Sequence, residues 1–167
     1  SDMWSRLRSS FNQVCSTSSS RLTAALKTQL GATDAECQQL THYLKLYKQH
    51  RELIHSGRLV RIDTIDNGQN VYGVVNPAQT QALFAIAQND FPCNMIADKL
   101  QISYLNPDAT YKVKLLNAQD NTGYLMKKSV PLCAGELVIS GKLIAEIGIQ
   151  LPIMHPQSIL LMSFREI

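Results

Sequence analysis

The sequence lacks the features that mark membrane-spanning, secreted and nucleic-acid-binding proteins. No run approaches the roughly 18 apolar residues of a membrane span, and the first residues lack the apolar core of a secretion signal. The net charge is only +3, and lysine and arginine are scattered along the chain. We therefore expect neither nucleic acid nor a membrane as a partner, and we expect a cytoplasmic location.

Cysteine motifs are also missing. The four cysteines are too far apart in the sequence for the CxxC spacing of metal and redox sites. We expect reduced, mostly buried thiols, because a free cysteine packs like a small apolar residue. The residues concerned are Cys15, Cys37, Cys93 and Cys133.

Catalytic patterns are equally scarce. The sequence has no glycine-rich phosphate loop and no G-x-S-x-G nucleophile motif. Asp63 and Asp66 lie three residues apart, as an acid/base pair could, but Asp66 belongs to an Asp-Asn-Gly turn, where aspartate is expected for its turn chemistry alone. We expect turn and surface roles for both residues.

The histidines do not form a metal-binding pattern. His42, His50 and His55 share one predicted helix at spacings of eight and five residues, whereas a helical metal site uses i, i+4. His155 precedes a proline in a loop and is expected to be structural or exposed. The sequence therefore predicts no catalytic residue, no cofactor-binding residue and no metal ligand.

A strong helical pattern occupies residues 33–56. Thr33 and Glu36 form a T-x-x-E capping box at its start, and Gly57 is expected to end it. One apolar stripe runs along this helix, consisting of Leu40, Tyr43, Leu44, Tyr47, Arg51 and Ile54, while the opposite face is polar. A shorter helix is expected over residues 21–30, with Gly31 just beyond it as a C′ residue that is free to take positive φ. Trp4, Leu7 and Phe11 have spacings of three and four, which allow a further short helix.

From residue 58 onward the apolar period changes from helical to two. Turn signals separate short alternating segments, which predict an antiparallel sandwich or barrel; of the two we expect an antiparallel β-sandwich of the Greek-key type. Residues 82–87 form an unbroken apolar run, typical of a central strand buried on both faces, and residues 140–156 read as irregular. The predicted strands are 58–65, 71–75, 82–87, 100–104, 110–115, 124–127, 137–139 and 158–165. The 167 residues thus suit a helical segment, 1–56, followed by one β-domain, 57–167.

Four stretches in order resemble bacterial α-galactosidases of glycoside hydrolase family thirty-six. Residues 47–58, Tyr-Lys-x-His-Arg-x-Leu-Ile-His-x-Gly-Arg, resemble that family's junction between barrel and C-terminal domain. The pair Gly-Val-Val at 73–75 and Ala-Leu-Phe-Ala at 82–85 resembles a family strand pair. Ser-Gly-Lys-Leu at 140–143, followed by the segment 148–156, resembles the family's closing segment, and 21–31 resembles an upstream helix.

The resemblance implies that the chain is the end of a (β/α)₈ barrel, 1–56, plus a C-terminal sandwich, 57–167. The family hydrolyses terminal α-galactosides with retention, which needs two carboxyl groups about 5 Å apart. Both family aspartates lie on barrel strands that this sequence does not contain, so no catalytic residue is carried over. The chain alone is expected to be inactive. Its expected partner is the missing barrel, and an α-galactoside substrate would be bound only by the complete parent enzyme. Without a barrel, the helical stripe is expected to fold back on the sheet or to support self-association.

An alternative is a stand-alone module that binds carbohydrate or another protein. Sugar-binding sandwiches usually present exposed aromatic platforms, whereas the only tryptophan here is Trp4, outside the β-region.

Overall fold

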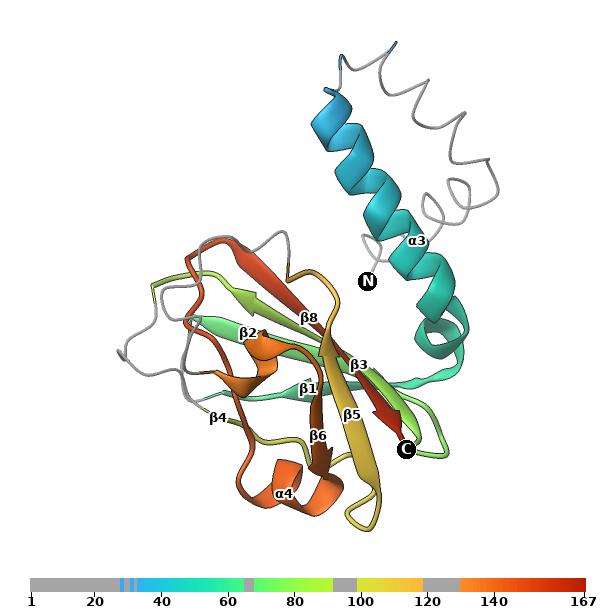
Figure 1. Ribbon diagram of the computed structural model, residues 1–167, viewed down its shortest axis with the longest axis vertical. Helices are drawn as coiled ribbons and strands as arrows, with labels where there is room; N and C mark the ends of the chain where they lie inside the picture. The colour runs from blue at the N-terminus through green and yellow to red at the C-terminus, as the bar shows by residue number, and fades with distance from the viewer. Residues whose placement is uncertain (1–27, 29–30, 32, 65–67, 92–98, 119–129) are drawn as a thin grey trace. The chain divides into compact units, whose positions relative to one another are not determined.

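The computed structural model describes residues 28, 31, 33–64, 68–91, 99–118 and 130–167. These residues form a long helix, α3, followed by a β-domain (Figure 1). The helix that begins at Trp4, most of the helix over 21–30 and the strand over 124–127 lie outside the described residues. The chain divides into two compact units, Ser1–Arg51 and Glu52–Ile167.

Helix α3 spans Asp34–Ser56, 23 residues, and begins with the predicted capping box. The Thr33 amide donates to Glu36 Oε2 at 2.8 Å, and the Glu36 amide donates to Thr33 Oγ1 at 3.3 Å. Each side chain thus satisfies an amide that the helix leaves unpaired at its first turn. Gly31 precedes the helix with φ +63°, the left-handed conformation that was predicted for it.

The predicted apolar stripe of α3 is the more buried side of the helix. Leu44 is buried, Leu40, Tyr43, Tyr47 and Ile54 are half-buried, and Arg51, which the prediction also placed in the stripe, is exposed. Cys37 and Leu53 are buried as well, although the sequence pattern did not include them in the stripe. On the polar side, the exposed residues are Gln38, Lys45, Lys48 and Glu52.

The described part of the β-domain contains a six-stranded antiparallel sheet in the order β1-β2-β3-β8-β5-β6. A two-stranded sheet pairs β4 with β7. Because β8 lies between β3 and β5, the last strand of the chain occupies the middle of the large sheet (Figure 1). The strands are β1 (Arg58–Ile62), β2 (Gln69–Val75), β3 (Gln81–Gln88), β4 (Lys99–Leu100), β5 (Thr110–Leu115), β6 (Leu137–Ser140), β7 (Ile149–Gln150) and β8 (Ser158–Glu166).

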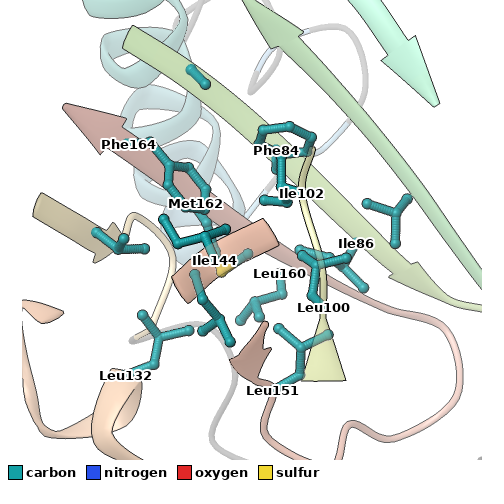
Figure 2. Packing of buried hydrophobic residues seen from close by; sticks show 14 of the residues in the cluster. Phe84, Ile86, Leu100, Ile102, Leu132, Ile144, Leu151, Leu160, Met162 and Phe164 are labelled. Carbon is teal, nitrogen blue, oxygen red and sulfur yellow. The ribbon is translucent and has the colours of Figure 1, made fainter. Parts of the chain in front are cut away.

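One face of the six-stranded sheet carries the core. Phe84 and Ile86 of β3 and Leu160, Met162 and Phe164 of β8 are almost fully buried. They pack with residues from the segments that cover this face, as Figure 2 shows, namely Leu100, Ile102, Leu132, Ile144 and Leu151. The covering segments include a 3-10 turn, η1 (Pro131–Ala134), and a short helix, α4 (Gly141–Glu146). The predicted mainly-β sandwich is therefore confirmed.

Several local predictions are wrong in detail. Strand β3 is central, but only alternate residues are buried and the others are half-buried, so it is not buried on both faces. The segment 140–156 is not irregular, because it contains α4 and β7. The alternating pattern at 100–104 does correspond to alternating burial, yet only Lys99–Leu100 pairs as a strand. Strand β1 ends at Ile62, earlier than predicted.

Candidate functional site

The junction between α3 and β1 consists of one residue, Gly57. Its amide donates to the Leu53 carbonyl at 2.8 Å, which closes the last turn of the helix. A Cβ atom at Gly57 would lie 2.6 Å from that same carbonyl oxygen and would collide with Val74 Cγ1 of β2. Glycine is therefore required here by space, and it allows the last helical turn to approach the sheet.

A second glycine motif, at 140–143, fixes the start of α4. Ser140 caps the helix by accepting a hydrogen bond from the Leu143 amide at 3.3 Å. The Gly141 amide donates to the Ala109 carbonyl at 2.8 Å, and a side chain at Gly141 would collide with the Asn106 carbonyl oxygen. The Ser-Gly pair thus combines a cap with a close backbone approach.

Tyr111 of β5 connects two loops by hydrogen bonds, the loop between β2 and β3 and the loop between β4 and β5. Its hydroxyl donates to the Gln79 carbonyl and accepts from the Asn106 amide, the latter at 3.0 Å. The Gln79 side chain in turn donates to the Tyr104 carbonyl at 2.9 Å, and Gln79 itself has φ +58°. Burial raises the pKa of the Tyr111 phenol above its usual value. The sequence placed Tyr111 in the core by alternation but gave no signal for this network.

Asn117 makes a comparable connection at the other end of the sheet. It is one of two buried polar residues among those described, together with Gln88. Its side-chain amide donates to the Ile159 carbonyl at 2.8 Å, and its oxygen accepts from the Leu161 amide at 2.9 Å. Asn117 therefore extends the pairing of β8 beyond the end of β5, a role that the sequence analysis missed.

The described residues do not include an acid/base pair formed by Asp63 and Asp66, the two acidic residues that the sequence analysis considered. The Asp63 side chain is 91% exposed and lies 3.4 Å from Arg61 in a surface ion pair, and Asp66 lies outside the described residues. Glu136 lies 2.6 Å from Lys112, and this hydrogen bond lowers the pKa of its carboxyl group. The hydrogen bonds from Thr33 likewise lower the pKa of Glu36. A general acid needs the opposite shift.

The histidines and cysteines are dispersed as well. His155 is exposed, as predicted, and His42 and His50 are half-buried on α3. Cys37 is buried and Cys133 half-buried, and neither is in a disulfide, while the other two cysteines lie outside the described residues. Within the described ranges, no group of three His, Cys, Asp or Glu side chains could hold a metal ion.

No protein-family model matches the sequence. An α-galactosidase from Escherichia coli is 34% identical over 138 residues, which is 79% of this chain but 20% of the relative. The structure of an α-galactosidase from Lactobacillus brevis superposes with a TM-score of 0.64 at 18% identity, over 84% of this chain and 18% of that one. This chain resembles the C-terminal region of a family thirty-six α-galactosidase.

Two further solved structures agree with this resemblance. A family thirty-six α-galactosidase from Geobacillus stearothermophilus, in complex with raffinose, has a TM-score of 0.64 at 16% identity and covers 83% of this chain. The galactosidase domain of an α-galactosidase–sucrose kinase has a TM-score of 0.62 at 22% identity and covers 81%. At these identities the structures establish the shared fold.

The chain spans about a fifth of the length of the proteins that it matches, between 17% and 20%. The resemblance expected from the four sequence stretches is confirmed, and it applies to one region of a much longer protein. In the described part of the chain, no helix combines the length and apolar character needed to cross a bilayer.

Proposed function

We propose that this chain is a non-catalytic structural domain of a longer α-galactosidase-like glycoside hydrolase. The observation that carries the proposal is the combination of 34% identity to an α-galactosidase with coverage of only a fifth of that relative. The motif glycines support it, since Gly57 and Gly141 lie in two of the stretches that resemble the family and neither position has space for a side chain. The parent reaction would be retaining hydrolysis of terminal α-galactosides, in a bacterial cytoplasmic enzyme.

In this proposal the catalytic chemistry belongs to the missing part of the parent. Residues 1–56 are the closing helices of its barrel, and residues 57–167 are its C-terminal sandwich. A retaining glycosidase places two carboxyl groups about 5 Å apart, at the carboxyl ends of barrel strands. The described carboxylates with shifted pKa, Glu36 and Glu136, are shifted downward and are both engaged in local hydrogen bonds, which suits structural roles.

The helical segment has a separate consequence when the barrel is absent. Leu40, Tyr43 and Tyr47 on the stripe of α3 are only half-buried. An apolar stripe of this kind favours association when its natural partner is missing. We therefore expect chain 1–167 on its own to self-associate through α3 at high concentration, which light scattering on a dilution series measures.

The size of the natural polypeptide tests the proposal. An antibody raised against chain 1–167 should detect, in lysates of the source, a protein about four times the 18.6 kDa of this chain, because 79% of this chain corresponds to 20% of the relative. A natural polypeptide of the mass of this chain alone would overturn it. Peptide mass fingerprinting of the detected protein would then show whether a barrel sequence precedes residue 1.

A further inference from the structure

We draw no further inference here: the strongest candidate, the exposed apolar surface patch of Leu143 and Ile147 at the end of α4, carries none because nothing in the structure shows what covers it.

Discussion

The ring of Phe84 lies directly over the α-carbon of Gly73. The two residues are paired across the ladder between β2 and β3, and a Cβ atom at Gly73 would fall inside the volume of the Phe84 ring. Phe84 is fully buried and meets Phe164 edge-to-face, with ring centroids 5.5 Å apart. The glycine therefore creates the space for the largest side chain on β3.

Gly73→Ala should destabilise the chain, because the added methyl group forces the Phe84 ring from its position. Overpacking of this kind costs about 1–3 kcal/mol, which urea unfolding would measure. Gly73→Ala combined with Phe84→Leu should lose less than the sum of the two single changes, since the smaller side chain relieves the collision. Strict additivity in this double-mutant cycle would contradict the packing relationship.

Tyr111→Phe should cost about 1–3 kcal/mol of unfolding free energy, because it leaves the Gln79 carbonyl and the Asn106 amide without their hydroxyl partner. The aromatic ring is retained, so the loss isolates the hydrogen bonds. Tyr72→Phe is the matched control, since Tyr72 is exposed and should change stability by less than about 0.5 kcal/mol. Equal effects of the two variants would show that the hydrogen bonds of the Tyr111 hydroxyl do not stabilise the fold.

The raised pKa of Tyr111 also predicts a loss of stability in alkali. Burial favours the neutral phenol in the folded chain, so folding raises the pKa above the usual 10.0. The corresponding stability is complete below pH 10 and is lost as the pH rises through the folded-state pKa. Urea unfolding at pH 8 and pH 11 should therefore show a steeper loss for the parent sequence than for Tyr111→Phe. Identical losses of stability in the parent sequence and in Tyr111→Phe would contradict the conclusion that burial raises the pKa of Tyr111.

The capping box of α3 predicts an acid-sensitive helix start. Thr33→Ala should reduce helicity in circular dichroism, because it removes the hydrogen bond to the Glu36 amide. Because the pKa of Glu36 is lowered, the stability that its carboxylate gives to the helix start is present above the usual carboxyl pKa. This stability is lost as the pH falls through the folded-state pKa. Glu36→Gln keeps an acceptor for the Thr33 amide and should remove this pH dependence; an unchanged acid response would refute the cap's role.

Local signals in the sequence predicted much of the fold. The capping box, the period change at Gly57 and the alternating strands depend on neighbouring residues, and each appears in the structure. Features that depend on contacts between residues far apart in the sequence could not be predicted from local sequence patterns. The position of β8 between β3 and β5, the Tyr111 network and the Asn117 connection join residues that are far apart in sequence. The apolar run at 82–87 was interpreted as burial on both faces, because apolar composition cannot distinguish a buried face from a half-buried one.

For the candidate site, the sequence identified residues but not their physical role. The sequence motifs identified Gly57, Gly73 and Gly141 as part of a resemblance, and the structure supplies the physical reason, which is the space that each leaves for a neighbouring atom.

The most direct test of the account measures hydrolysis of p-nitrophenyl α-galactoside by chain 1–167 and by the full natural polypeptide that contains it. In the proposed parent the catalytic carboxylates lie outside this chain, so chain 1–167 should release no nitrophenol above the buffer blank, while the full polypeptide should turn over the substrate. Turnover by chain 1–167 alone, proportional to its concentration and surviving further purification, would contradict the account.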